Sequence, residues 1–366
     1  MPERTLVAFQ GRRDGRSAFG IVNAQWSRGL AAAGYAVGDY SPGAPAPDIL
    51  IHHDFESHFT AFEPPAGVPS VAVRTWDFGP LPPAWVEKIN RGFAQYWAHT
   101  SWIAGLAREA GVDPDRIRIV PHGIDPGVFR PDGPSFPLAT EKRFRLLFVG
   151  GVSVRKGSDI LLEAYRQAFT ADDDVCLVLK DHSADLFYRD NHARDRIAEL
   201  RTDPLAPEIV HLDTFLPEPD LAALYRACDV AVFPYRAEGF CIPILEAMAC
   251  GTPAIVPEFG ACLDFCTAET SHLVKPRRIR APVSRSFSVA LGFEERITAV
   301  DFCELGVSHL IGALRAARDA SAGAHAAKAA AGVARAHGSF TWAKATEIVL
   351  AQLAPLAHQA LPSIER

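Results

Sequence analysis

Short runs of β-branched and aromatic residues alternate along the chain with stretches in which apolar residues recur at helical spacing. The first pair is TLVAFQG, which predicts a strand, and residues 21–33, which predict a helix ending at Gly34. Further strands are predicted in YAVGDY, PDILIHHDF, PSVAVRTWDFG, RLLFVG, VCLVLK and EIVHL. The alternation indicates an α/β protein built from βαβ units.

One βαβ unit, AVFPYRAEGFCIPILEAMACGTPAIVP (residues 231–257), combines this pattern with candidate chemistry. A strand ends at Pro234, a polar loop follows, and a helix with Pro243 in its first turn stops at Gly251. Glu238 in the loop and Glu246 in the helix therefore belong to the edge of the sheet where open α/β proteins bind ligands. The two acids allow three interpretations. They could complement the helix dipole, they could form a glycosidase-like pair, or they could bind sugar and ribose hydroxyls. A glycosidase pair is disfavoured because both acids come from one short element, whereas its members must flank a bond.

A second polar loop, GVSVRKG, lies between the strand RLLFVG and a predicted helix over residues 158–169, with Ser158 as its N-cap. Arg155 and Lys156 precede the helix N-terminus, and cations beside such a terminus are typical of a diphosphate site. Surface charge without a ligand is the alternative. The order Lys-Gly-Ser is not the Gly-Lys-Ser/Thr of a P-loop, and Gly11, Gly15 and Gly20 do not form the dinucleotide fingerprint.

Length and composition narrow the class of protein. The 366 residues predict two domains, and the net charge of −6 argues against a nucleic-acid partner. Four prolines and two glycines between Asp125 and Arg143 predict an interdomain linker. Seven cysteines, an odd number without zinc-site spacing, and no apolar run of membrane-spanning length predict reduced thiols in a cytoplasmic protein. The Ala-rich stretch 313–336 predicts a surface helix, and FTWAKATEIVLAQLAPLA predicts an amphipathic helix from Thr341.

The stretch EGFCIPILEAMACGTPAIV resembles the Glu-x7-Glu motif of family 4 glycosyltransferases, which are retaining enzymes of the GT-B fold. The resemblance extends to the Arg-Lys-Gly of residues 155–157, and the family usually has Gly where this chain has Cys241. It implies two Rossmann-like domains with parallel sheets facing across a cleft. The implied boundaries are 1–130 for the acceptor-side domain, 131–142 for the linker, 143–340 for the nucleotide-sugar domain and 341–366 for a closing helix that returns to the first domain.

The resemblance also implies roles for single residues. Arg155 and Lys156 would stabilise the departing diphosphate, Glu238 would orient the donor sugar, and Glu246 would hold the ribose. Main-chain and loop contacts to the donor are implied for Gly20, Gly151, Thr214, Phe215, Leu216, Gly239, Phe240, Cys241 and Ile242. Many relatives carry His-Asp where this chain has Trp76-Asp77, so no catalytic histidine is carried over and Asp77 remains a candidate for an acceptor hydroxyl or a loop cap. His52 and His53, at the end of one strand, and His122 are expected to be structural.

We therefore expect a metal-independent, retaining glycosyltransferase without a bound cofactor, using a UDP- or GDP-linked sugar and a glycan, lipid-linked or small-molecule acceptor. A GT-B nucleotide-sugar epimerase and a non-catalytic sugar-nucleotide-binding protein are the alternatives. The basic segment KPRRIRAPVSR is expected to be a solvated loop followed by apolar FSVALGF, with peripheral contact to the inner face of a membrane as the second interpretation.

Overall fold

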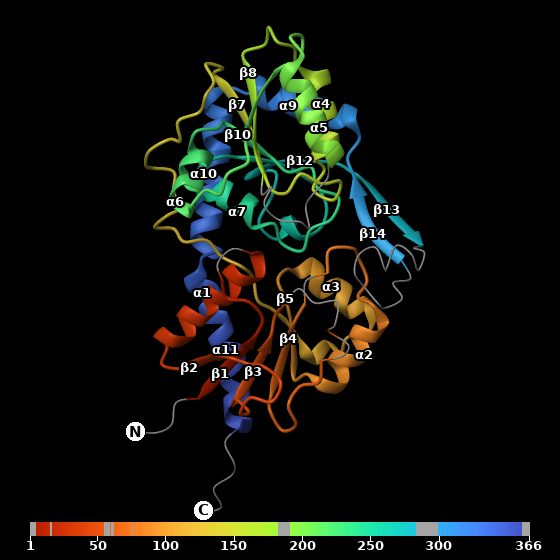
Figure 1. The fold of residues 1–366 in the computed structure, drawn as a ribbon, viewed down its shortest axis with the longest axis vertical. Helices are drawn as coiled ribbons and strands as arrows, with labels where there is room; N and C mark the ends of the chain where they lie inside the picture. Colours follow the sequence, from red (N-terminus) through yellow and green to blue (C-terminus); the bar gives the residue numbers. More distant parts are fainter. Residues whose placement is uncertain are drawn as a thin grey trace, which may run out of the picture. The chain divides into compact units, whose positions relative to one another are not determined.

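The computed structural model describes residues 5–14, 17–54, 59, 62–74, 76–181, 191–282 and 299–360. The chain divides into two compact units (Figure 1). The first comprises residues 1–123, 280–301 and 342–366, and the second comprises residues 124–279 and 302–341. Residues 125–143 contain neither helix nor strand.

The first unit is built on a six-stranded parallel sheet in the order β2-β1-β3-β4-β5-β6. Its strands are β1 (Leu6–Gln10), β2 (Ala36–Asp39), β3 (Ile49–His52), β4 (Ser70–Val73), β5 (Gln95–Ala98) and β6 (Ile117–Ile119). Its helices are α1 (Ala18–Ala32), α2 (Pro83–Gly92), α3 (Ser101–Ala110), the 3-10 turn η1 (Pro114–Arg116) and α11 (Trp342–Ala360). Every residue of β3, β4 and β5 is buried, as expected for parallel strands covered on both faces.

Helix α11 closes the first unit although it follows the second unit in the chain. It packs on α1 and β3. The close approach depends on Gly29 of α1, because a Cβ atom there would lie 2.4 Å from the side chain of Thr346. Helix α1 begins at Ala18, earlier than the predicted Ile21, because Ser17 accepts a hydrogen bond from the Gly20 amide (3.0 Å) and caps the helix.

The second unit is built on another six-stranded parallel sheet, in the order β12-β11-β10-β7-β8-β9. Its strands are β7 (Phe144–Val149), β8 (Val175–Lys180), β9 (Glu208–Leu212), β10 (Val230–Val232), β11 (Ala254–Pro257) and β12 (Ser271–Val274). Its helices are α4 (Ser158–Ala168), α5 (Asn191–Thr202), α6 (Glu218–Arg226), α7 (Ile242–Ala249), the turn η3 (Ala261–Asp264), α9 (Val307–Asp319) and α10 (Ala322–Ser339). The strand order reverses between β7 and β10, which places the topological switch point between these two strands.

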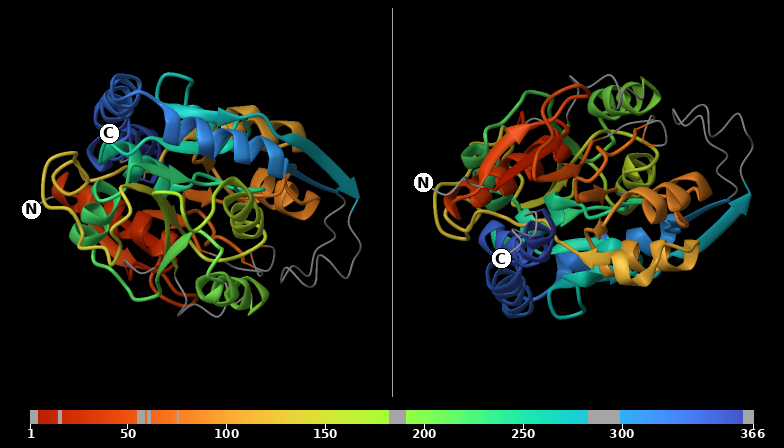
Figure 2. Two further views of the ribbon diagram at one scale, coloured as in Figure 1. Left: turned by 90° about the horizontal axis from the view of Figure 1, so that it is seen from above. Right: turned by 90° about the horizontal axis from the view of Figure 1, so that it is seen from below.

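Two predictions about the later part of the chain are wrong in detail. The Ala-rich stretch forms two helices, α9 and α10, separated at Ala320 and capped again by Ser321 (Figure 2). The basic segment is not a loop over residues 277–282, which form strand β13 (Arg277–Pro282) paired with β14 (Ala299–Glu304). The apolar FSVALGF lies outside the described residues.

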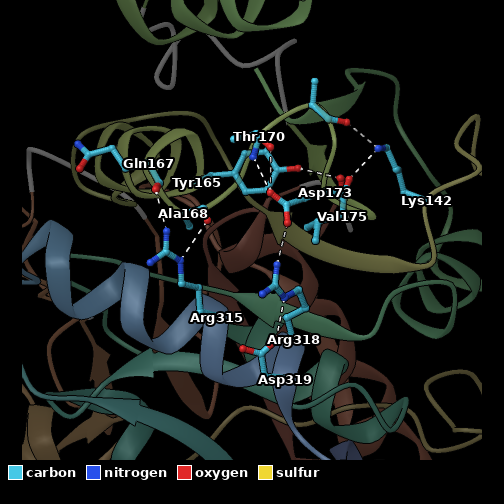
Figure 3. A network of polar contacts seen from close by, with 11 residues as sticks. Lys142, Tyr165, Gln167, Ala168, Thr170, Asp173, Val175, Arg315, Arg318 and Asp319 are labelled. Carbon is cyan, nitrogen blue, oxygen red and sulfur yellow. Dashed lines mark hydrogen bonds and ion pairs between the residues drawn. The ribbon is translucent and has the colours of Figure 1, made fainter. Parts of the chain in front are cut away.

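Polar contacts at the C-terminal end of α4 hold this helix against α9 (Figure 3). Arg315 of α9 donates hydrogen bonds to the carbonyl oxygens of Ala168 (3.1 Å) and Gln167 (3.2 Å). These carbonyls belong to the last turn of α4, where a cation also complements the helix dipole. Arg318 pairs with Asp173 at 3.0 Å in the following turn. The C-terminal end of α4 is thereby fixed, and its N-terminal end faces the switch point.

Candidate active site

The loops after β7 and β10 meet at the switch point of the second sheet. These strands are parallel neighbours, with Leu146 opposite Val230, so their carboxyl ends lie at the same edge. Loop 150–157 follows β7 and contains Arg155 and Lys156, whereas loop 233–241 follows β10 and contains Glu238. The fold therefore brings the two predicted cations to the predicted acid.

Arg155, Lys156 and Glu238 form one ion-paired cluster. Arg155 donates from Nη1 to Glu238 Oε1 (3.1 Å) and to the Ala237 carbonyl oxygen (3.0 Å). The Lys156 ammonium also contacts Glu238 Oε1. Glu238 is 7% exposed, and the cation side chains are 19% and 17% exposed. Burial raises the pKa of Glu238, but the charges and hydrogen bonds of Lys156 and Arg155 outweigh that effect and hold the pKa below its ordinary value.

Gly157 allows the two loops to approach each other. Its backbone is left-handed (φ 74°), and a Cβ atom would lie 2.0 Å from the carbonyl oxygen of Pro234. Gly157 is also the residue at which α4 is capped, so the predicted N-cap Ser158 is wrong. Ser158 is instead the first helical residue, and its hydroxyl donates to the Ser153 carbonyl oxygen (3.2 Å). Lys156 therefore stands one residue before the cap, beside the N-terminus of α4.

Glu246 occupies a different environment on α7. The Tyr225 hydroxyl of α6 donates to Glu246 Oε2 at 2.8 Å. Burial raises the pKa of Glu246 to about 7; the hydrogen bond from Tyr225 opposes this shift and Glu218 adds to it. Near neutral pH this carboxyl therefore exchanges between a neutral form and a charged form. Tyr225 had no signal in the sequence, because a tyrosine at helical spacing reads as an ordinary core residue.

Among the residues between the two acids, Phe240 and Cys241 bury their side chains in the core of the second unit. Phe240 is buried and packs on Phe265, with ring centroids 5.2 Å apart. Cys241 is the N-terminal cap residue of α7 and has φ 66°, the only left-handed non-glycine backbone among the described residues. A left-handed backbone favours glycine, which explains why the family that this motif resembles usually has Gly at this position. Gly239 is buried, Ile242 begins α7, and Pro243 lies in the first turn as predicted.

The other predicted donor-binding residues lie on separate segments. Gly151 is buried in loop 150–157. Thr214 and Phe215 are exposed between β9 and α6, Phe215 at 75%, and Leu216 packs on the core. In the first unit, Gly20 belongs to the first turn of α1, and its amide is used by the Ser17 cap. Asp77 is half-buried in the loop after β4, beside buried Trp76, which packs on Trp85.

Four histidines that the structure describes in the first unit are buried and uncharged at neutral pH. Burial lowers the pKa of His52 to about 3 and of His99 to about 4, and lowers the pKa of His53 and His122 well below the ordinary value. His53 donates from Nδ1 to Asn23 Oδ1 (2.7 Å), and the ring centroids of His99 and His122 lie 3.9 Å apart. Such packing supports the predicted structural role of His52, His53 and His122.

We expect a glutamine at position 246 to abolish one pH dependence of stability. The folded pKa of Glu246 is raised above its unfolded value, so its proton is bound more tightly in the folded state. The resulting contribution is present at low pH and is lost as pH rises from about 4.5 to about 7, by at most about 3 kcal/mol. Glu246→Gln should therefore match the wild type near pH 5 and be more stable by about 1–3 kcal/mol near pH 8.

Thermal melting of both proteins across this pH range measures the effect. Glu199→Gln is the matched control, because Glu199 lies on the exposed face of α5 and pairs with Arg196 at 2.9 Å. Parallel melting curves for Glu246→Gln and wild type at all pH values would show that the Glu246 carboxyl is not perturbed.

Comparisons with known proteins agree with the fold. Solved structures that share the fold include Anabaena Alr3699/HepE in complex with UDP and glucose, with a TM-score of 0.68 and 13% identity over 96% of this chain and 100% of that chain. Sucrose-phosphate synthase from Thermosynechococcus elongatus has a TM-score of 0.68 and 17% identity over 98% of this chain and 100% of that one. The two parallel six-stranded sheets with their helices are those of the GT-B fold, and the prediction of this fold is confirmed.

Residues 134–281 match the family described as Glycosyl transferases group 1. A D-inositol 3-phosphate glycosyltransferase of Catenulispora acidiphila is 33% identical over 210 residues, which are 53% of this chain and 49% of that protein. A second, from Pseudarthrobacter chlorophenolicus, is 31% identical over 48% of this chain and 42% of that protein. The chain thus spans about half the length of the curated relatives that it matches. The matched family region contains Arg155, Lys156, Glu238 and Glu246.

Proposed function

We propose that the protein is a retaining glycosyltransferase that moves a hexosyl group from a UDP- or GDP-linked sugar to an acceptor hydroxyl. The observation that carries the proposal is the cluster of Arg155, Lys156 and Glu238 at the switch point between β7 and β10. The match of residues 134–281 to the group 1 glycosyltransferases supports it. The relatives' names and the UDP and glucose bound to the Anabaena protein support a nucleotide-sugar donor.

The donor diphosphate would replace Glu238 as the partner of the two cations. Arg155, Lys156 and the N-terminus of α4 would then stabilise the negative charge that grows on the diphosphate as the bond to the anomeric carbon breaks. This positive charge makes a metal ion unnecessary in the proposed mechanism. Glu238, released from its ion pairs, would accept hydrogen bonds from the donor sugar, and Glu246 would accept them from the ribose.

Retention follows if the acceptor attacks from the face that the leaving group vacates. The acceptor oxygen forms a bond to the anomeric carbon, the carbon–phosphate-oxygen bond breaks, and the departing phosphate oxygen takes the acceptor proton. No separate base is required in this scheme, and Asp77 would orient the acceptor hydroxyl. The acceptor is a glycan, a lipid-linked glycan or a small molecule.

The compartment and membrane contact are part of the proposal. All seven cysteines are free and buried thiols, which supports a reducing compartment such as the cytoplasm. Within the part of the chain that the structure describes, no helix has both the length and the hydrophobicity needed to cross a bilayer. The exposed Lys275, Arg277, Arg278 and Arg280 would support peripheral contact with an anionic membrane surface.

Thermal-shift measurements with a panel of UDP- and GDP-sugars test the proposal. We expect one nucleotide sugar to stabilise the protein more than its bare nucleotide does, because Glu238 adds contacts to the sugar. Incubation of that donor with candidate acceptors should then release the nucleoside diphosphate. The new glycosidic linkage should have the same anomeric configuration as the donor. Isomerisation of the donor without an acceptor would instead identify an epimerase, and binding without turnover would identify a sugar-nucleotide-binding protein.

A further inference from the structure

Arg236 is an arginine of the site loop that sequence reasoning did not single out. Its guanidinium donates from Nη1 to Asp159 Oδ1 (2.8 Å) and from Nη2 to Asp159 Oδ2 (2.9 Å), a two-pronged pair. Nη1 also donates to the carbonyl oxygen of Val154 at 2.5 Å. The side chain is only 14% exposed. An arginine held by so many partners is part of the framework of the site rather than a solvated surface charge.

Asp159 is the second residue of α4, directly beside the N-terminus that the proposed diphosphate would approach. A carboxylate in the first turn stabilises a helix by complementing its dipole. The same negative charge repels any anionic ligand at that terminus. The guanidinium of Arg236, which also lies 3.7 Å from Glu304 Oε1, offsets the charge of Asp159 and so lowers this repulsion.

The side chain of Arg236 holds loop 150–157 through Val154, and its backbone adds bonds that a methionine at this position would keep. Its amide donates to the Arg155 carbonyl oxygen at 2.8 Å, and its own carbonyl oxygen accepts from the Cys303 amide at 2.9 Å. The Arg155 side chain returns to the Ala237 carbonyl oxygen. Hydrogen bonds on both sides of Arg236 therefore join loop 150–157 to loop 233–241. Strand β14 adds the bond from the Cys303 amide.

We propose that Arg236 is a positioning residue that neutralises Asp159 and holds loop 150–157 in place, so that the N-terminus of α4 and its two cations can bind the diphosphate of the donor. This inference rests on the proposed function, since it assigns a role within the same site. It concerns recognition of the diphosphate specifically. The nucleoside part of the donor should not depend on Arg236.

The test compares binding of nucleoside diphosphate, nucleoside monophosphate and nucleoside to Arg236→Met by calorimetry, with the base chosen from the donor panel. We expect the nucleoside diphosphate to bind about tenfold more weakly, because an uncancelled carboxylate then faces it. Binding of the nucleoside should change by less than about twofold. The weakening should diminish at high salt, which screens Asp159.

A second substitution separates charge from framework. In the Arg236→Met background, Asp159→Asn removes the exposed charge, and we expect it to restore diphosphate affinity to within about threefold of wild type. If the double variant binds the diphosphate as weakly as Arg236→Met, or more weakly, Arg236 is a purely structural residue and the inference is wrong.

Arg318→Met is the matched control, because Arg318 pairs with Asp173 at the opposite end of α4 (Figure 3). It should lower melting temperature without changing diphosphate affinity. The failures of the two proposals can be told apart. A wild-type protein that binds no nucleoside diphosphate contradicts the proposed function, whereas wild-type affinity in Arg236→Met contradicts only the role of Arg236.

Discussion

Replacement of Glu238 by Gln should slow turnover strongly and at the same time tighten the binding of nucleoside diphosphate. The ligand-free carboxylate neutralises Arg155 and Lys156, so a diphosphate must compete with it for the same cations. The neutral amide of Gln competes less, and we expect the dissociation constant of the bare diphosphate to fall about tenfold. Transfer should slow by about 10²–10³, because the group that orients and stabilises the donor sugar has lost its charge.

The opposite signs of these two effects exclude partial unfolding, which would weaken binding and catalysis together. Initial rates of nucleotide release and calorimetric titration with the nucleoside diphosphate measure them. Glu199→Gln, the exposed acid on α5, should change neither quantity. Weaker diphosphate binding by a folded Glu238→Gln protein would contradict the competition between carboxylate and diphosphate.

Gly157→Ala should be the most destabilising single-methyl change in the site. The new Cβ atom would lie 2.0 Å from the Pro234 carbonyl oxygen, and alanine disfavours the left-handed backbone of this position. We expect a loss of about 3 kcal/mol or more in unfolding free energy, seen as a fall in melting temperature of the second unit. Gly157→Asn should be as unstable as the alanine variant, because asparagine tolerates φ of 74° but carries the same Cβ atom.

Gly312→Ala provides a control of opposite sign. Gly312 lies within α9, and a Cβ atom there meets nothing within 4 Å. The substitution should stabilise the protein by about 0.5–1 kcal/mol, because alanine loses less backbone entropy in a helix.

Rescue of stability by asparagine at position 157 would show that backbone conformation alone, without the steric clash, makes glycine necessary.

Much of the fold could be predicted from the sequence because parallel strands buried on both faces have continuous apolar runs. The juxtaposition of Lys156 and Glu238 could also be predicted, since both follow strands whose carboxyl ends belong to the ligand-binding edge. This prediction needed only the order of elements and the resemblance to a known motif. It did not need the conformation of any loop.

The contacts that depend on loop conformation could not be predicted. Arg236 and Asp159 are 77 positions apart. Their pairing depends on the conformations of loop 150–157 and loop 233–241, which contain no helix or strand. The expected cap at Ser158 was wrong because the close approach of Pro234 requires a left-handed glycine one residue earlier. In the basic run at 277–282 only the four residues Arg278–Ala281 alternate polar and apolar side chains before Pro282, so its pairing with β14 had a weak local signal.

The placement of α11 sets an order in which the protein can assemble. The first unit has its sheet in the first third of the chain, yet the helix that covers α1 and β3 is synthesised only after the entire second unit. Until α11 has been synthesised, the surface of α1 around Gly29 is uncovered in the ribosome-bound chain. The nascent chain therefore carries an incomplete first unit while the second unit already has all its strands, and we expect chaperones to bind the first unit rather than the second.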